Sequence, residues 1–534
     1  MDKYIAGTIL RVGVGVAVLT SLSLAFLTQK VYHKSPTEMY VDGDYESGCL
    51  WPPAPTRIVV PWFEDGRMSL IQGITAAAMD LQAAHVAGRP GESVEDWLIR
   101  SELASRIKLV FPSANKRLEQ NRKMLSDAPV TKDLSAFERL KRWTAGLGQD
   151  KPYYQGDPRQ VATRLRNVED PLITVEFVDE PDVEETDNAL ARSIAERPDV
   201  RAVIGHERSR VAVASAVAYE DKGILYLSPK ATLARLTRHR FKYAFRLVPS
   251  DDAFAETLAA YTKYRDWNRI GVIYARFEQG EALAREFAFH LRKVWATPSP
   301  DNADDGETTL DADAAPDAPR DELLRNSAAT RDLELAYFRS YLPSARDAYA
   351  RADHRELLEE VTKFEVDVLL LADQFPWAAK MMRDMRQMGV TQPVLGGELL
   401  DSSQAWRRAG EAADNLYVAT VVDPQSRSQE YKEFQARFRE YFSGRSAGYG
   451  SVQGYEAFNL LFNAIVESKC TNPQVLATTL RTTQWEGVFG YYHFDNTNAI
   501  IGRDVHIKKV YFVDGRGSFS TIFPPKPQSK VSFP

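Results

Sequence analysis

The sequence predicts an α/β protein made of two Rossmann-like lobes. Short apolar strands alternate with helices along most of the chain: residues 200–205 form a strand, 211–222 a helix and 224–227 the next strand. Residues 366–372 are a nearly continuous apolar run of the kind found in parallel sheets that helices cover on both faces. Because this alternation occurs in two halves of the chain, we expect two lobes of similar construction.

The remaining elements continue the pattern. The chain has 534 residues, 44% of them hydrophobic, which is enough for two or three domains with cores of their own. Further strands are expected at 57–63, 172–178, 270–274 and 394–395. Further helices are expected at 69–87, 186–197, 254–265, 281–294 and 377–388.

Two segments interrupt the alternation. Residues 89–168 are rich in Lys and Arg and are predicted to form an inserted helical subdomain, either with a solvated basic face or as a docking surface for a partner protein or anionic lipid. Residues 298–319 contain seven acidic residues and no basic one, so we expect a disordered insertion reaching to about 332. The acids lack the spacing and the glycine of a calcium-binding loop.

The first 34 residues differ from the rest. Residues 12–27 carry no charge, and counting back to Ile5 gives about one bilayer-spanning helix with Arg11 near its cytoplasmic end. The favoured prediction is an uncleaved membrane anchor; the alternative is a signal peptide cleaved near Ala25. Either one exports the chain beyond residue 35, where residues 35–56 form a linker.

Composition and motifs narrow the function. The net charge of −6 argues against a nucleic-acid-binding protein, which is usually basic. The two cysteines, Cys49 and Cys470, lack metal-ligand spacing, but they could form one disulfide in an oxidising compartment. No G-x-S-x-G, H-E-x-x-H or Walker A motif occurs, so neither an enzyme, a cofactor nor a metal site is predicted.

Residues 203–252 carry a specific resemblance. Their order and spacing resemble the branched-chain amino-acid-binding proteins, the leucine/isoleucine/valine-binding group of type I periplasmic binding proteins. The likeness continues over most of 57–515, outside the two interrupting segments. The matching pieces of the core are Ile204-Gly205-His206, Tyr219 to Leu225, Ser228-Pro229-Lys230-Ala231-Thr232, Leu236-Thr237, Phe245-Arg246 and Pro249-Ser250-Asp251.

The resemblance implies how the two lobes are assembled. In this family the chain crosses between the lobes three times. Carried onto this chain, lobe 1 takes residues 57–248 and 421–494, and lobe 2 takes 249–420 and 495–534. The ligand is expected in the cleft between them, at the carboxyl ends of the strands.

The resemblance also implies ligand-binding residues. Ser209 and Thr232 match the residues that hold a ligand carboxylate, the backbone carbonyl of Lys230 faces the ammonium, and Glu398 matches the acid that pairs with it from lobe 2. Each residue has a plainer interpretation. Ser209 could only cap the following helix, Thr232 could only cap a turn, and Glu398 could be a solvated acid.

Several positions depart from the family pattern. Gln279 stands where a tyrosine is common, Gln374 follows a strand where an aromatic or small residue is usual, and Arg208 and Arg210 flank Ser209. These residues make the expected site more polar and basic than a leucine site, which favours a polar or acidic ligand. The alternative is that both arginines point to solvent. His206 is interpreted as a structural hydrogen-bonding residue.

The predicted function is binding of an amino acid or a related polar or acidic organic ligand for delivery to an ABC-type permease. The protein is placed on the periplasmic side of a bacterial inner membrane, attached by its N-terminal segment. The alternative is a membrane-anchored sensing or assembly protein with the same fold and an envelope-protein partner.

Overall fold

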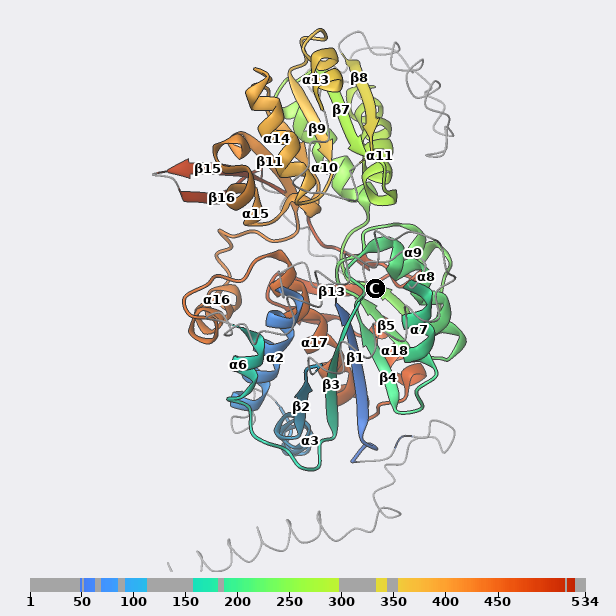
Figure 1. Ribbon diagram of the computed structural model, residues 1–534. Helices are drawn as coiled ribbons and strands as arrows, with labels where there is room; N and C mark the ends of the chain where they lie inside the picture. The colour runs from blue at the N-terminus through green and yellow to red at the C-terminus, as the bar shows by residue number, and fades with distance from the viewer. Residues whose placement is uncertain are drawn as a thin grey trace, which may run out of the picture.

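The computed structural model describes residues 49, 52–62, 69–84, 92–112, 157–180, 187–296, 333–342, 354–513 and 516–523, which form two α/β lobes (Figure 1). The predicted anchor at 1–34, most of the linker at 35–56 and the acidic segment at 298–332 lie outside these residues. Among the described residues, no helix is both long and apolar enough to cross a membrane.

Lobe 1 is built on a sheet of six parallel strands. Along each strand the side chains alternate between its two faces; Ile58 and Val60 enter one hydrophobic cluster, and Val59 enters another on the opposite face. In spatial order the strands are β2 (Ile107–Val110), β3 (Ile173–Asp179), β1 (Thr56–Trp62), β4 (Val200–Ile204), β5 (Leu225–Ser228) and β6 (Ala244–Arg246).

Helices cover both faces of this sheet. One face carries α2 (Ser69–Ala84), α3 (Val94–Ser105), α17 (Tyr449–Ser468) and α18 (Pro473–Thr482), and the other carries α7 (Asp187–Ala195) and α8 (Ser209–Asp221). Lobe 1 also contains α6 (Pro158–Ala162), α9 (Arg235–Arg238), α16 (Gln429–Tyr441), β12 (Trp485–Gly487), β13 (Gly490–Phe494) and β14 (Ile500–Ile501).

Small residues let α2 and α17 approach closely. A Cβ atom on Gly73 would lie 1.9 Å from the carbonyl oxygen of Ser451, and one on Gly454 would lie 2.2 Å from that of Leu70. Glycine at these positions therefore holds the second pass of the chain through lobe 1 against the first.

Lobe 2 is built on a mixed sheet of seven strands. In spatial order they are β16 (Arg516–Phe523), β15 (His506–Val513), β11 (Leu416–Thr420), β10 (Val394–Gly396), β9 (Val368–Ala372), β7 (Arg269–Ala275) and β8 (Glu334–Tyr341). The pairs that β15 forms with β11 and β16 are antiparallel, and the other pairs are parallel. The covering elements are α10 (Asp251–Tyr264) and α11 (Glu278–Ala296) on one face, and α13 (Arg355–Val361), α14 (Trp377–Gln387), α15 (Gln404–Ala409), η4 (Glu398–Leu400) and η5 (Gly410–Ala413) on or beside the other.

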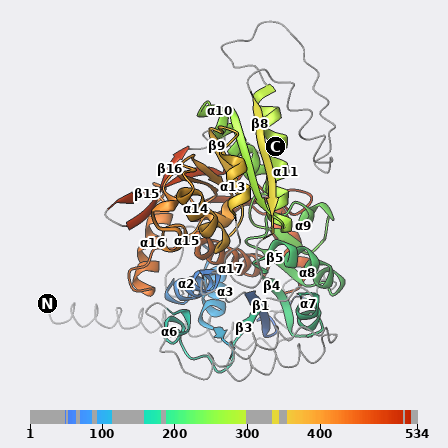
Figure 2. The same cartoon turned by 45° about the horizontal axis from the view of Figure 1, so that its top comes forward.

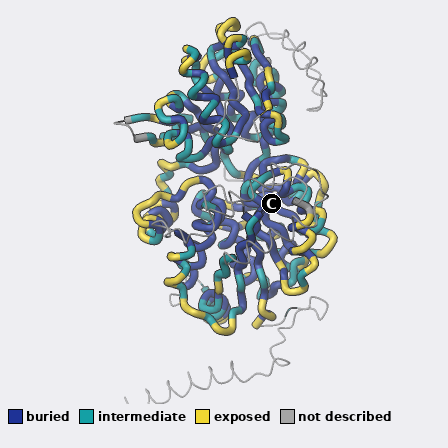
Figure 3. Tube along the Cα trace, in the orientation of Figure 1, coloured by how far each residue is buried: buried dark blue, intermediate teal, exposed yellow. Residues whose placement is uncertain are grey.

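The chain passes between the lobes three times: between β6 and α10, between β11 and α16, and between β14 and β15. Figure 2 shows the lobes from a second side, and Figure 3 shows the buried strands at the centre of each lobe. One hydrophobic cluster continues across the boundary, since it includes Tyr449 and Val452 of lobe 1 together with Tyr417 and Ile507 of lobe 2. The lobes are therefore in direct contact.

Two expectations about the lobes are corrected. The segment 89–168 is predicted to be a helical insertion, but β2 lies within it and forms the edge of the lobe 1 sheet beside β3. Its four residues, IKLV, are too short for periodicity to separate them from the preceding helix. The boundary predicted after residue 494 is also too early, because β14 pairs with β13 of lobe 1.

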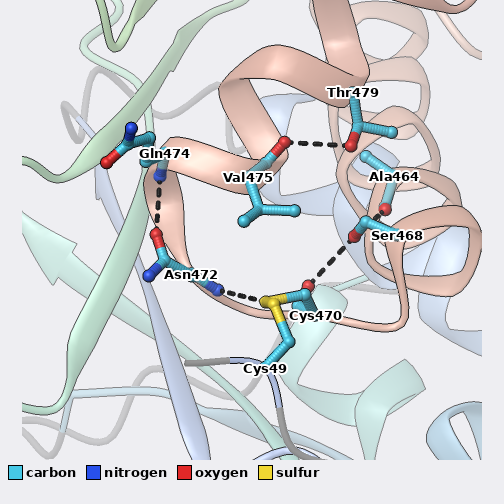
Figure 4. The surroundings of a disulfide bond; sticks show 8 residues. All are labelled: Cys49, Ala464, Ser468, Cys470, Asn472, Gln474, Val475 and Thr479. Atoms are coloured by element: carbon cyan, nitrogen blue, oxygen red, sulfur yellow. Dashed lines mark hydrogen bonds between the residues drawn. A yellow bond between two sulfur atoms is a disulfide. The ribbon is translucent and has the colours of Figure 1, made fainter. Parts of the chain in front are cut away.

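A disulfide joins the two cysteines, 421 positions apart in the sequence (Figure 4). Cys470 is buried between α17 and α18, and its sulfur accepts a hydrogen bond from the backbone N–H of Asn472 at 3.3 Å. Asn472 in turn caps α18 through the N–H of Gln474 at 2.9 Å. The bond thus fastens the segment before β1 to the second pass of the chain through lobe 1.

We expect the Cys49→Ser, Cys470→Ser double variant to unfold more easily than the wild type, because the bond closes a very long loop of the unfolded chain. The expected loss is roughly 2–4 kcal/mol in the free energy of unfolding, measured by urea denaturation. Reductant should lower the wild-type value in the same way and leave the double variant unchanged. Two free thiols in the untreated native protein would contradict the pairing.

Candidate functional site

Two predicted residues of lobe 1 lie together at the carboxyl ends of β4 and β5. Ser209 is the first residue of α8, and Thr232 lies in the turn after β5; both are buried. The backbone N–H of Thr232 donates to Ser209 Oγ at 3.2 Å. No side-chain cap is found at the start of α8 or α9, so the capping interpretation of Ser209 and Thr232 does not describe this structure.

Two predicted residues of lobe 2 meet Thr232 from the other side. Gln279 lies in the first turn of α11, and Glu398 begins η4 just after β10. The Gln279 Nε2 atom donates to Thr232 Oγ1 at 2.7 Å and to Glu398 Oε1 at 2.5 Å. Glu398 is 3% exposed and Thr232 is fully buried, so these bonds are shielded from water.

A fifth residue, Asp251, was missed. It begins α10 at the first crossing between the lobes, and the sequence reading treated it as part of a hinge. Thr232 Oγ1 donates to Asp251 Oδ1 at 2.8 Å, and the Asp251 N–H donates back to the Thr232 carbonyl at 3.0 Å. Its position in the Pro249-Ser250-Asp251 motif was the available signal. We call Ser209, Thr232, Asp251, Gln279 and Glu398 the inter-lobe network.

The two acids of the inter-lobe network favour their protonated forms. Burial, and then the nearby Asp251 carboxyl, raise the pKa of Glu398 to about 8, although Lys230 acts in the opposite direction. Burial raises the pKa of Asp251 to about 7 against the hydrogen bond from Thr232 and the charge of Arg246. A cation placed between these acids would favour their ionised forms.

The remaining predicted residues lie outside the inter-lobe network. The Lys230 ammonium donates to Glu207 Oε2 at 2.6 Å. The Gln374 N–H donates to the buried Asp373 carboxyl at 2.7 Å, and no hydrogen bond among the described residues joins Gln374 to the network. These contacts neither support nor exclude the backbone role expected for Lys230.

The predicted basic edge is largely neutralised. Arg208 donates to Glu180 Oε1 at 3.0 Å, and the other oxygen of this buried acid lies 2.6 Å from His206 Nδ1. Arg210 is exposed. His206 also lies 2.9 Å from the Tyr219 hydroxyl, so its contacts are those of a structural residue. The acid that pairs with Arg208 comes from the end of another strand, and for this reason the sequence pattern did not reveal it.

Other polar groups are buried near the network. Burial, and then the Glu398 carboxyl, raise the pKa of the Tyr449 hydroxyl, which has no hydrogen-bond partner among the described residues. Gln453 lies one helical turn further along α17, is 1% exposed, and its amide atoms also lack partners in the described part of the chain. Buried polar atoms of this kind call for a partner.

Two further features carry no ligand assignment. Asp252, Glu286 and His290 have ligand atoms within 4.8 Å of one another, but the cations Arg238 and Lys293 act on this group, which we interpret as an ion-pair cluster. A pocket beside the disulfide is lined by residues including Cys49, Arg201 and Cys470 and contains none of the predicted ligand-binding residues.

We expect the free energy of unfolding to fall as pH rises from about 4.5 to about 8, because folded Glu398 keeps a proton that the unfolded chain releases. The stabilisation is complete below the lower value and is lost through the higher one. In Glu398→Gln the fall should be shallower, by up to about one proton in the slope. Urea denaturation across this pH range measures it, with the exposed Glu430→Gln as control; equal slopes for the wild type and Glu398→Gln would contradict the shift.

Comparisons with known proteins agree with this architecture. A family model described as "Periplasmic binding protein" matches residues 331–513, and one described as "Receptor family ligand binding region" matches 167–294. The chain is similar to the leucine-specific-binding protein of Salmonella typhimurium, with 23% identity over 334 residues, 62% of this chain and 78% of that protein. It is also similar to a leucine-, isoleucine-, valine-, threonine- and alanine-binding protein of Pseudomonas aeruginosa, with 20% identity over 55% of this chain and 68% of that protein.

A solved structure supports the same fold. The crystal structure of a leucine-binding protein from Thermotoga maritima superposes with a TM-score of 0.57, at 15% identity, over 88% of this chain and 99% of that one. The relatives are solute-binding proteins and not enzymes. With its two lobes, three crossings and matching family models, the chain belongs to the type I periplasmic binding proteins, in the group of the leucine/isoleucine/valine-binding proteins.

Proposed function

We propose that this protein binds an amino acid or a related polar or acidic organic acid between its lobes and delivers it to an ABC-type permease. The observation that carries the proposal is the inter-lobe network, in which Thr232 of one lobe and Glu398 of the other converge on the same nitrogen atom. The similarity to leucine-specific and branched-chain amino-acid-binding proteins supports an amino-acid-like ligand.

The chemistry of the inter-lobe network suits such a ligand. A carboxylate would accept from the Ser209 hydroxyl and from the Thr232 N–H, which donates to Ser209 Oγ in the present structure. An ammonium would donate to Thr232 Oγ1, Glu398 and Asp251, with the Lys230 carbonyl as a further acceptor. Since Glu398 belongs to lobe 2 and Ser209 to lobe 1, the ligand would contact both lobes and stabilise their closed arrangement.

The unpartnered groups on α17 favour a polar ligand. Tyr449 and Gln453 are buried, and their polar side-chain atoms have no hydrogen-bond partner among the described residues. A leucine side chain would leave these atoms unsatisfied, whereas a second carboxyl or amide group of the ligand would pair with them. Arg208, which pairs with Glu180, no longer carries the argument for a polar ligand.

Transport is favoured over sensing because the named relatives are binding proteins of transport systems or resemble them in name and fold. An extracytoplasmic location agrees with the disulfide, since such bonds persist in oxidising compartments. As part of the same proposal, the first 34 residues attach the protein to the inner membrane.

A thermal-shift screen of amino acids and organic acids on the full chain tests binding. We expect at least one compound to raise the melting temperature, because a ligand at a hundred times its dissociation constant stabilises by about 2.7 kcal/mol. Glu398→Ala should abolish this increase, and Glu430→Ala, a substitution of an exposed glutamate on α16, should keep it. A stabilising ligand whose effect survives Glu398→Ala would place binding elsewhere.

Calorimetry tests the ligand class. We expect aspartate, glutamate or a related organic acid to bind more tightly than leucine or valine. Tyr449→Phe should weaken that binding by about three- to tenfold, the effect of one hydrogen bond to a buried hydroxyl. The removed hydroxyl lacks a partner among the described residues, so the variant should fold normally. Tighter binding of leucine or valine would contradict the polar ligand.

A further inference from the structure

We propose that in the free protein the side-chain amide of Gln279 takes the place of the ligand's ammonium and holds the two lobes together until a ligand displaces it. This inference rests on the proposed function for the identity of the displaced group. The lobe contact itself can be tested without any ligand.

The hydrogen bonds of Gln279 carry the inference. Its Nε2 atom has two N–H groups, and each has an acceptor: Thr232 Oγ1 at 2.7 Å in lobe 1 and Glu398 Oε1 at 2.5 Å in lobe 2. These are the same oxygens that would receive the ammonium of an amino acid. A nitrogen donor from the chain and one from the ligand cannot occupy the same position, so binding requires Gln279 to leave.

The backbone at this position is fixed, which limits how Gln279 can leave. A Cβ atom on the following residue, Gly280, would lie 2.7 Å from the carbonyl oxygen of Ala275 and 2.8 Å from that of Ala372. The start of α11 is therefore packed directly against the ends of β7 and β9. Gln279 can be displaced only by rotation of its side chain or by separation of the lobes.

A neighbouring ion pair adds to the lobe contact at the surface. Glu278 of lobe 2 pairs with Arg235 of α9 in lobe 1. The Arg235 side chain is 56% exposed, so water and salt screen this pair strongly. Gln279, at 8% exposed, makes the shielded contact and should control the closed arrangement.

The exchange is favourable for a charged ligand. The amide of Gln279 is a neutral donor, whereas an ammonium forms charge-assisted bonds with an ionised Glu398. An ammonium would also provide a third N–H group for Asp251, whose Oδ2 atom has no hydrogen-bond partner among the described residues. The closed free state thus selects against compounds without an ammonium, because they cannot replace what Gln279 supplies.

Distance measurements on the ligand-free full chain test the proposal. Spin labels at Val217→Cys on α8, 58% exposed, and at the exposed Arg407→Cys on α15 report the separation of the lobes. We expect the wild type to populate mainly the short distance. Gln279→Ala should lower the closed-to-open ratio by about five- to tenfold, the value of one hydrogen bond.

Two further variants separate the amide from packing and from general effects. Gln279→Met keeps the length of the side chain without its N–H groups and should open the lobes as Gln279→Ala does. Gln387→Ala removes an exposed glutamine of α14 and should leave the distances unchanged. Identical distances in the wild type, Gln279→Ala and Gln279→Met would overturn the proposal.

Affinity provides a second readout that depends on a ligand. For an amino acid that stabilises the wild type, Gln279→Ala should bind it more tightly, since the internal competitor is gone. Weaker binding by Gln279→Ala would show that Gln279 is a ligand contact and would overturn the proposal. If no compound stabilises the wild type, the proposed function fails, while the distance measurements still decide the role of Gln279.

Discussion

Buried polar atoms need partners, and between these lobes the partners come from opposite sides. The Thr232 hydroxyl donates to Asp251 and accepts from Gln279, which also donates to Glu398, so one chain of hydrogen bonds connects lobe 1 to lobe 2. If the lobes separate, each of these groups loses a partner inside the protein and must find water or a solute instead. The dependence of this contact on pH and on small molecules follows from that condition.

Each lobe is otherwise a self-contained layered structure. Parallel strands with apolar side chains on both faces need helices on both faces, and lobe 1 obtains part of its cover from α17, which enters after the chain has visited lobe 2. The glycines between α2 and α17 make that late contact close. Three crossings therefore keep the lobes beside each other, while the inter-lobe network lies among the chain segments that move least within each lobe.

Much of this arrangement was predictable from the sequence. Central strands such as β4 and β9 are short apolar runs, and the structure places them within a few residues of their predicted positions. The strands that were not predicted, β2, β8, β15 and β16, lie at or near sheet edges, where one face is partly exposed and charged or polar residues interrupt the apolar pattern. Edge strands therefore lack the signal that identifies central ones.

The site followed the same logic. Ser209, Thr232, Gln279 and Glu398 were identified through a resemblance, because motif order carries information that periodicity does not. Asp251 was visible in a matching motif but was given a hinge role, and the partner of Arg208 lay in a distant strand end. Pairing of Cys49 with Cys470 depends on three-dimensional proximity alone, which no sequence spacing expresses.

The disulfide also divides the protein mechanically. It clips the segment that precedes β1 onto lobe 1, beside the start of α18, so any tether in the first 48 residues pulls on lobe 1 alone. Lobe 1 then acts as the stationary half of the molecule, and lobe 2 as the swinging half whose orbit is centred on a fixed base. A binding event would be felt at a distance as a displacement of lobe 2, and the surface it presents outward is the one a docking protein would have to follow.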